Sequence, residues 1–297
     1  MEIAERTGVA EAGWRLPRQL AAGLALVAIA WPLAWLGPKP FSSYTFLPLW
    51  LGYILTVDGL TARRTGTSPL TRSGRRFVLL FVFSLPLWWL FEFANQFLGN
   101  WRYVLTHDYV PLTYVAIASI AFSTVMPAIF VTAEFYRGFR PFAPARRWVR
   151  FAPSRGGLVV IAALGLAMFV ASLAFPEVAF PLVWIGLFLL ADAINALTGS
   201  PSIAAQVAGG RWDTVLVLFA AGLTCGFFWE MWNYWSMPKW VYDIPYASRP
   251  LVFEMPLLGY GGYLPFALEV YAFHHLLHGV FSRRQDDFLR FDEPARE

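Results

Sequence analysis

Residues 77–99, FVLLFVFSLPLWWLFEFANQFLG, and residues 214–236, TVLVLFAAGLTCGFFWEMWNYWS, are apolar runs that are each long enough to cross a bilayer as a helix. One crossing needs about 20 such residues. Hydrophobic residues make up 58% of the sequence and charged residues only 14%, which is typical of membrane proteins. Further apolar runs lie near 16–37, 41–62, 112–136, 156–175, 178–197 and 254–281. The sequence therefore predicts an all-α, polytopic membrane protein of about eight transmembrane helices.

The basic residues predict which ends of these helices face the cytoplasm. The chain has 23 Lys and Arg residues, and nearly all lie in the termini or in alternate connections between the runs. The exceptions, on the opposite side, are Lys39, Arg102, Lys239 and Arg249. Because retained Lys and Arg mark cytoplasmic loops, we expect an integral protein of the cell (inner) membrane with both termini in the cytoplasm. The net charge of +4 is part of this topology signal, and we expect no nucleic-acid partner.

A motif of Glu-x-x-Asn followed by Trp-x-Tyr occurs twice in the chain. Its residues are Glu92, Asn95, Trp101 and Tyr103 in the first copy and Glu230, Asn233, Trp240 and Tyr242 in the second. An earlier match between residues 50–58 and 184–192 makes the repeat four helices long. Because four is even, both copies enter the membrane from the same side, as parallel repeats do. We therefore predict one repeat over 1–150, a second over 151–282, a cytoplasmic tail over 283–297, and a site between the halves.

Glu92 and Glu230 are the strongest candidates for function. Each lies near the outer end of an apolar helix, where an ionisable side chain is costly and marks a functional site by default. Residues three apart share a helix face, so we expect each glutamate to lie beside Asn95 or Asn233 and to accept a hydrogen bond from its amide. Burial would keep a proton on such a carboxyl, which is what a general acid needs.

Two further carboxyls belong to the last apolar run. Glu254 begins this run and is expected at the same depth as Glu92 and Glu230, with Lys239 and Arg249 nearby. Glu269 lies deeper, near the middle of the membrane. The predicted catalytic residues are Glu92, Glu230, Glu254, Asn95 and Asn233.

Aromatic residues surround both glutamates in the sequence. Tryptophan faces stabilise cations best among side chains, so this setting suits protonation of a polyene, whose carbocation has no water around it. The predicted substrate-binding residues are Trp88, Trp229, Trp232, Trp101, Tyr103, Trp240, Tyr242, Arg249 and Glu269. An alternative for the four Trp-x-Tyr residues is the aromatic belt at the membrane interface, or packing.

Three other acidic residues have a simpler interpretation. Asp58 and Asp192 fall at the cytoplasmic ends of their runs, where we expect contacts with loop arginines. Glu134 is expected to contact Arg137 for the same reason.

His274, His275 and His278 invite a metal hypothesis, because histidines at i and i+4 can share one ion. The chain has only 4 histidines, and the fourth, His107, falls in an outer connection. A histidine-rich di-iron centre cannot be assembled from this set. We expect the three to be polar residues reaching the inner interface, and we expect no metal and no cofactor.

The order of acid, Trp-x-Tyr, Arg-Pro and a second acid resembles that of the integral-membrane lycopene cyclases and related carotenoid-biosynthesis proteins. The resemblance covers two short stretches. It is carried by Glu230, Trp240, Tyr242, Arg249, Pro250 and Glu254, and by Glu92, Trp101 and Tyr103. It implies a redox-neutral, acid-initiated rearrangement of a long isoprenoid, with carboxylates as acid and base and aromatic residues guarding the cation.

The sequence thus predicts a lycopene cyclase-like isomerase that cyclises, isomerises or hydrates an isoprenoid or similar membrane lipid. Glu230 or Glu254 would protonate the polyene, and Glu92 would remove the final proton. A proton-coupled transporter is one alternative, and its site would lie at the midplane with broken helices. A non-catalytic lipid-binding protein is the other. In that case Asn95 and Asn233 would satisfy both glutamates, and no lipid-sized pocket would lie between the halves.

Overall fold

The computed structural model describes residues 16–137, 139, 141–142, 148–247, 249–281 and 288–290. Helices make up most of this part of the chain, so the predicted all-α class is confirmed. The helices of the first half are α1 (Arg18–Leu36), α2 (Phe46–Thr65), α3 (Pro69–Arg72), α4 (Gly74–Leu98), α5 (Pro111–Phe122) and α6 (Val125–Arg137), with the 3-10 turn η1 (Phe41–Tyr44). Those of the second half are α7 (Arg155–Ala174), α8 (Pro176–Ala179), α9 (Leu182–Thr198), α10 (Ile203–Ala208), α11 (Asp213–Tyr234) and α12 (Tyr263–Phe281), with the 3-10 turn η3 (Leu257–Gly262).

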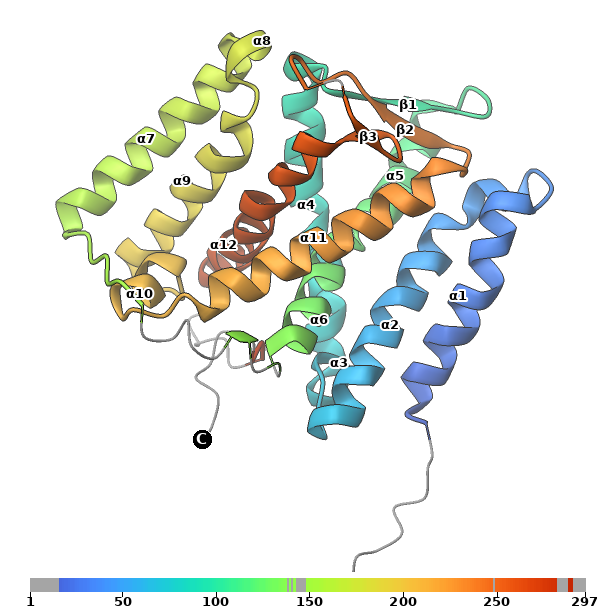
Figure 1. Cartoon of the computed structure of the whole chain (residues 1–297), viewed down its shortest axis with the longest axis horizontal. Helices are drawn as coiled ribbons and strands as arrows, with labels where there is room; N and C mark the ends of the chain where they lie inside the picture. Colours follow the sequence, from blue (N-terminus) through green and yellow to red (C-terminus); the bar gives the residue numbers. More distant parts are fainter. Residues whose placement is uncertain are drawn as a thin grey trace, which may run out of the picture.

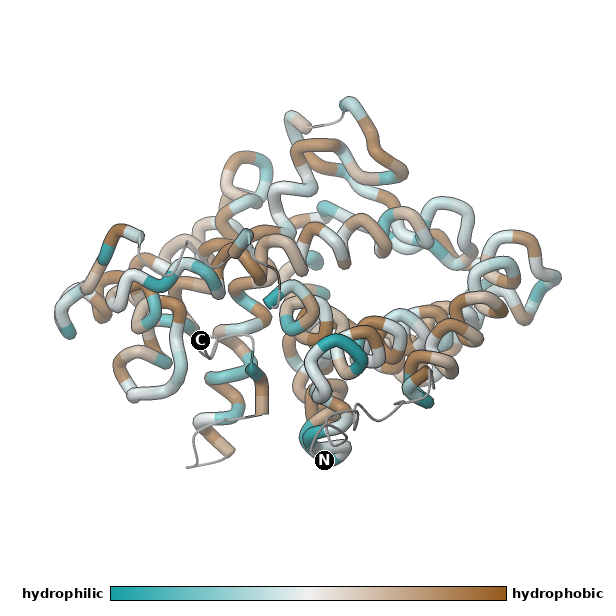
Figure 2. Tube along the Cα trace, turned by 60° about the horizontal axis from the view of Figure 1, so that its bottom comes forward, coloured by the Kyte–Doolittle hydropathy of each residue, from teal (hydrophilic) through white to brown (hydrophobic). Residues whose placement is uncertain are grey.

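Several of these helices have the length and composition of membrane spans. Within the described residues, five helical segments are long and apolar enough to cross a membrane. They are Arg18–Leu36, Gly74–Leu98, Pro111–Arg137, Arg155–Ala174 and Asp213–Tyr234. Helix α9 is also apolar but shorter. Figure 2 shows hydrophobic residues spread along the helices, as expected of a protein that faces lipid.

Two helical hairpins flank a central group of helices (Figure 1). Helix α1 packs along α2 on one side, and α7 packs along α9 on the other. Within each hairpin the two helices pack closely because glycines lie at their contact. A methyl group on Gly23 would lie 2.7 Å from the carbonyl oxygen of Gly52, and one on Gly165 would lie 2.7 Å from that of Gly186. Small residues at such contacts are common where membrane helices pack closely.

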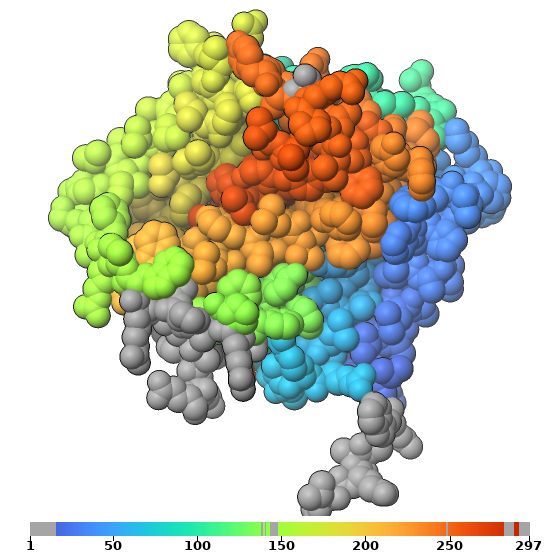
Figure 3. Space-filling view, in the orientation of Figure 1, coloured from blue at the N-terminus to red at the C-terminus, as the bar shows by residue number. Residues whose placement is uncertain are grey.

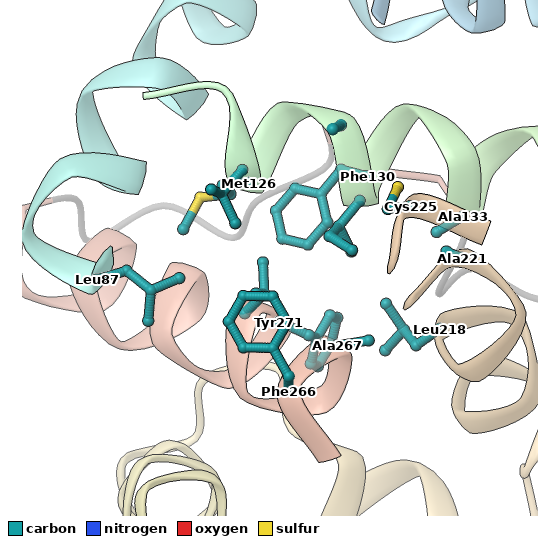
Figure 4. Packing of buried hydrophobic residues seen from close by; sticks show 14 of the residues in the cluster. Leu87, Met126, Phe130, Ala133, Leu218, Ala221, Cys225, Phe266, Ala267 and Tyr271 are labelled. Atoms are coloured by element: carbon teal, nitrogen blue, oxygen red, sulfur yellow. The ribbon is translucent and has the colours of Figure 1, made fainter. Parts of the chain in front are cut away.

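The core lies among α4, α6, α11 and α12 (Figure 4). Met126 and Phe130 of α6 are fully buried there against Leu218 of α11 and Tyr271 of α12. In Figure 3 the last part of the chain, in orange and red, forms a continuous surface between the two flanking hairpins. The central helices thus hold the two halves together.

Short strands join the halves at one end of the molecule (Figure 1). Strand β1 (Trp101–Val104) pairs antiparallel with β2 (Lys239–Tyr242), and β3 (Leu251–Val252) pairs with β4 (Met255–Pro256). The two Trp-x-Tyr motifs, one from each half, therefore form strands that pair with each other. The expected helix over 254–281 is wrong in its first part, because β4 and η3 occupy 255–262 and α12 begins at Tyr263.

Asp58 and Asp192 each cap the short helix that follows their own. Asp58 accepts hydrogen bonds from the hydroxyl of Ser68 (2.8 Å) and the backbone amide of Leu70 (3.0 Å), at the start of α3. Asp192 accepts one from the amide of Ile203 (2.7 Å), at the start of α10. The predicted contacts with loop arginines are therefore wrong. The first amides of a helix lack partners within the helix, and these carboxylates supply them.

Glu134 makes an ion pair that the sequence did not indicate. Its two carboxylate oxygens lie 2.5 and 2.6 Å from the guanidinium of Arg72 on α3, not beside Arg137 as predicted. The Nε of Arg72 also donates to the carbonyl of Phe288 (2.9 Å). The predicted repeat boundary near 150 and the tail over 283–297 fall largely outside the described residues, which include only 288–290 of that tail.

Candidate functional site

A cavity of about 440 Å³ lies below the β1–β2 sheet, with walls from both halves of the chain. Residues of α2, α4, α5, α9, α11, α12 and the strands line it, and most of its surface is apolar. Small-molecule sites in proteins usually have volumes of roughly 300–1,000 Å³ and mostly apolar walls. The cavity therefore has the size and character of a ligand site.

Glu92 of α4 is not among the described wall residues, but three wall residues donate hydrogen bonds to one of its oxygens. Its Oε1 accepts hydrogen bonds from the indole nitrogens of Trp88 (3.0 Å) and Trp101 (3.2 Å) and from the hydroxyl of Tyr103 (2.6 Å). The residue is only 8% exposed. Because hydrogen bonds to an ionised acceptor are the stronger kind, these three donors can stabilise a negative charge on this oxygen.

Glu230 of α11 also accepts hydrogen bonds from aromatic residues, but its second oxygen is buried without a partner in the described part of the chain. Its Oε1 accepts hydrogen bonds from the hydroxyls of Tyr242 (2.6 Å) and Tyr263 (2.7 Å), and more weakly from the indole of Trp240 (3.4 Å). Its Oε2 is buried and has no hydrogen-bond partner in the described part of the chain. A buried charge without full partners is costly, so this arrangement favours the neutral acid with its proton available.

The asparagines of the repeated motif bind the backbone, not the carboxyls. The side-chain nitrogen of Asn95 donates to the carbonyl of Trp101 (2.8 Å), and that of Asn233 donates to the carbonyl of Trp240 (2.7 Å). The predicted Asn-to-Glu hydrogen bond is therefore wrong. The chain that leaves each helix has unpaired backbone groups, and the amide satisfies these first. Each asparagine thus positions the strand whose Trp and Tyr reach the glutamate.

The strand tyrosines are suited to remain hydrogen-bond donors. Burial raises the pKa of Tyr103 well above its ordinary value, and the nearby Glu92 raises it further. Burial and the nearby Glu230 raise the pKa of Tyr242 in the same way. Both hydroxyls therefore keep their protons across the neutral range and can hydrogen-bond to the carboxyls.

The predicted aromatic residues all line the cavity. They are Trp88, Trp101, Tyr103, Trp229, Trp232, Trp240 and Tyr242. Their role in binding a substrate stays a prediction. The sequence analysis missed Trp184, Tyr263 and Phe266, which also form the wall. Trp184 could have been identified from the sequence, because it matches Trp50 in the repeat.

Glu254 and Arg249 are not brought to the cavity wall. Glu254, on the turn between β3 and β4, forms an ion pair with Lys239, as its expected proximity to that residue suggested. Arg249 is exposed, and neither it nor Glu254 is among the described residues that line the cavity. Glu92 and Glu230 are not wall residues either, but wall tyrosines hydrogen-bond to both, so the expected group of three carboxyls at one site reduces to these two.

Glu269 lies inside the helix bundle, away from the cavity wall. It is 1% exposed, and neither carboxyl oxygen has a hydrogen-bond partner among the residues that the structure describes. His274 and His275 are buried on the same helix, with ring centroids 5.0 Å apart. In the described ranges, no group of three or more His, Cys, Asp or Glu side chains is placed to hold a metal ion.

Comparison with known proteins finds no matching family model, no matching curated protein and no matching solved structure. The functional argument therefore rests on the chemistry of the two glutamates and on the cavity that their hydrogen-bond partners line.

Proposed function

We propose that the protein is an integral membrane enzyme that carries out an acid-initiated, redox-neutral rearrangement of a long isoprenoid, as a lycopene cyclase does. The reaction would be a cyclisation, a double-bond isomerisation or a hydration. One observation carries the proposal: two buried carboxyls each accept hydrogen bonds from residues that line one apolar cavity with aromatic walls. Such a reaction moves protons and needs no redox partner.

In this proposal Glu230 is the acid and Glu92 is the base. The proton of Glu230 goes to a carbon of a double bond, which forms a C–H bond and leaves a carbocation on the substrate. After rearrangement, the carbon next to the cation loses a proton to the Glu92 site, whose partners Trp88 and Tyr103 line the cavity, and the electron pair of that C–H bond forms the new double bond. Each glutamate has three donors on Oε1, and the complete burial of Glu230 with its unpartnered Oε2 in the described part of the chain supports this division of roles.

The aromatic wall supports a cationic intermediate. An indole face stabilises a desolvated cation by about 2 kcal/mol or more. Trp229 and Trp232 line the cavity from the side of Glu230, and Trp88 and Trp101 from the side of Glu92. The mostly apolar wall also keeps water from the cation until rearrangement is complete.

The distribution of charge supports a cytoplasmic location for both termini and an outer-leaflet location for the cavity. The arginines at the ends of α2, α3 and α6 and at the start of α7 lie opposite the strands, while Lys39, Arg102, Lys239 and Arg249 lie at the strand end. An isoprenoid dissolved in the bilayer would then reach the cavity without crossing water. A cell membrane is the location that fits this arrangement.

The test is expression of the chain in cells that accumulate lycopene, followed by chromatography of the pigments. We expect a new pigment from the wild type and its loss in both Glu92→Gln and Glu230→Gln. Glu177→Gln, on the exposed start of α8, is the matched control and should retain the product. The absence of any new pigment while the wild-type protein is present in the membrane would refute the proposal for this substrate class.

A proton-coupled transporter is the second candidate, and Glu269 is the observation that favours it. A buried acid without hydrogen-bond partners in the described bundle resembles the proton-carrying acids of transporters. Proteoliposomes with a trapped pH dye would reveal proton movement driven by a lipid or solute gradient. The asparagine contacts and the cavity argue against the third alternative, a non-catalytic lipid-binding protein.

A further inference from the structure

The two glutamate sites differ in their third hydrogen-bond donor. In the first half that donor is Trp88, which precedes Glu92 by one helical turn on α4. The residue one turn before Glu230 on α11 is Gly226. Tyr263, from the first turn of α12, donates to Glu230 instead.

Gly226 makes the space that Tyr263 occupies. A methyl group on Gly226 would lie 2.5 Å from Cε2 and 2.7 Å from Cγ of the Tyr263 ring, closer than real carbon contacts allow. A methyl group on Gly222, one turn earlier, would collide with the backbone carbonyl of Tyr263. The two glycines therefore let α12 approach α11 closely enough for the tyrosine to reach the glutamate.

Tyr263 links the buried acid to the cavity. Its hydroxyl is 2.7 Å from Glu230 Oε1, and the residue lines the cavity, whereas Glu230 is not among the described wall residues. Its ring stacks on Trp229, with centroids 6.0 Å apart. Tyr242 also touches Glu230, but its hydroxyl is engaged on both sides, because it accepts from Trp240 (2.8 Å) and donates to the carboxyl (2.6 Å).

We propose that Tyr263 is a catalytic residue that transfers the proton of Glu230 to the substrate, an inference that rests on the proposed function above. A neutral carboxylic acid can carry its proton on either oxygen, and the heavy-atom positions do not fix the direction of the hydrogen bond. With the proton on Oε1, Glu230 donates to the oxygen of Tyr263. The hydroxyl hydrogen of Tyr263 then points into the cavity.

The transfer balances as a two-proton relay. The O–H bond of Tyr263 breaks as a C–H bond forms on the polyene, and the proton of Glu230 moves to the oxygen of Tyr263. The tyrosine ends as it began, Glu230 becomes a carboxylate that Tyr242 stabilises, and the substrate carries the positive charge. Trp88 cannot do this for Glu92, because an indole N–H only donates a hydrogen bond. Tyr103 also hydrogen-bonds to Glu92 from the cavity wall, so the assignment of the second site as the acid site rests on the complete burial of Glu230, which is 0% exposed against 8% for Glu92.

The test compares Tyr263→Phe with the wild type in membranes supplied with lycopene. We expect the rate of product formation to fall by about 100-fold or more, the usual contribution of a general acid, while binding measured by quenching of tryptophan fluorescence is unchanged. The matched control is Tyr260→Phe, which removes a hydroxyl that donates to the carbonyl of Val252 (3.3 Å) and does not hydrogen-bond to Glu230, and it should not change the rate.

A second measurement covers the case in which Tyr263→Phe does not fold. Placing 3-fluorotyrosine at position 263 keeps the ring and makes the hydroxyl more acidic, so we expect the rate and its pH profile to shift, with no shift from 3-fluorotyrosine at position 260. Product from the wild type that is undiminished in Tyr263→Phe, or a rate insensitive to the fluorine, would overturn the relay alone. A loss of substrate binding in Tyr263→Phe would also overturn it, in favour of a structural role. No product from the wild type would overturn the proposed function and the relay together.

Discussion

The assignment of Glu92 as a carboxylate and Glu230 as a neutral acid predicts a measurable difference between two hydrogen bonds of equal length. Tyr103 donates to Glu92 and Tyr242 donates to Glu230, each at 2.6 Å. A hydrogen bond to a charged group contributes about 1.5–3 kcal/mol to stability, and one between neutral groups about 0.5–1.5 kcal/mol. The Tyr103–Glu92 pair should therefore be the stronger by about 1 kcal/mol or more.

Double-mutant cycles isolate each pair from its surroundings. One cycle combines Tyr103→Phe with Glu92→Gln, and the other combines Tyr242→Phe with Glu230→Gln. The coupling energy removes the separate cost of the bond between Trp240 and Tyr242, which a single substitution would include. The assay is the free energy of unfolding by denaturant in mixed micelles. Equal coupling energies, or a larger one at Glu230, would refute the assigned charge states.

The remaining predictions concern packing and the inner ion pair. Gly226→Ala should lower the free energy of unfolding by about 1–3 kcal/mol because its methyl group overlaps the Tyr263 ring, whereas Gly261→Ala, with no atom within 4 Å of its added methyl, should be tolerated. Thermal unfolding of the two variants in detergent checks this, and equal stabilities would contradict it. Glu134→Gln should cost about 3–5 kcal/mol, because it leaves the buried guanidinium of Arg72 without its carboxylate. Denaturant unfolding measures this loss, and a change below about 1 kcal/mol would show that the pair is not effectively buried.

The apolar runs were sufficient to predict the helices but not where all of them begin and end. Residues 255–262 are apolar enough to extend the last run, yet they form β4 and a 3-10 turn, because three glycines and a proline disfavour a helix there. The run over 112–136 is similarly divided after Phe122. Hydropathy measures the preference for lipid and carries little information on such local backbone choices.

The candidate site was predicted in part, because its central residues recur in the sequence. The repeat indicated Glu92 and Glu230 together with their Trp-x-Tyr partners. Both Trp-x-Tyr segments form strands that pair with each other, which explains why they recur with the glutamates. The asparagine contact was wrong because helical spacing does not show where the chain goes after the helix ends. Tyr263 was missed because it lies 33 residues after Glu230. The sequence feature that allows their contact is Gly226, which has no side-chain carbon to block the tyrosine ring.

The central claim is that a proton exchangeable with solvent is added to a carbon of an isoprenoid in this cavity. The most direct test is to run the wild-type reaction in D₂O and to measure the mass of the product. The account predicts that the product carries deuterium at the carbon that is protonated, and that Glu230→Gln membranes yield no such labelled product. A rearranged product without deuterium from the wild type would contradict the acid-initiated reaction.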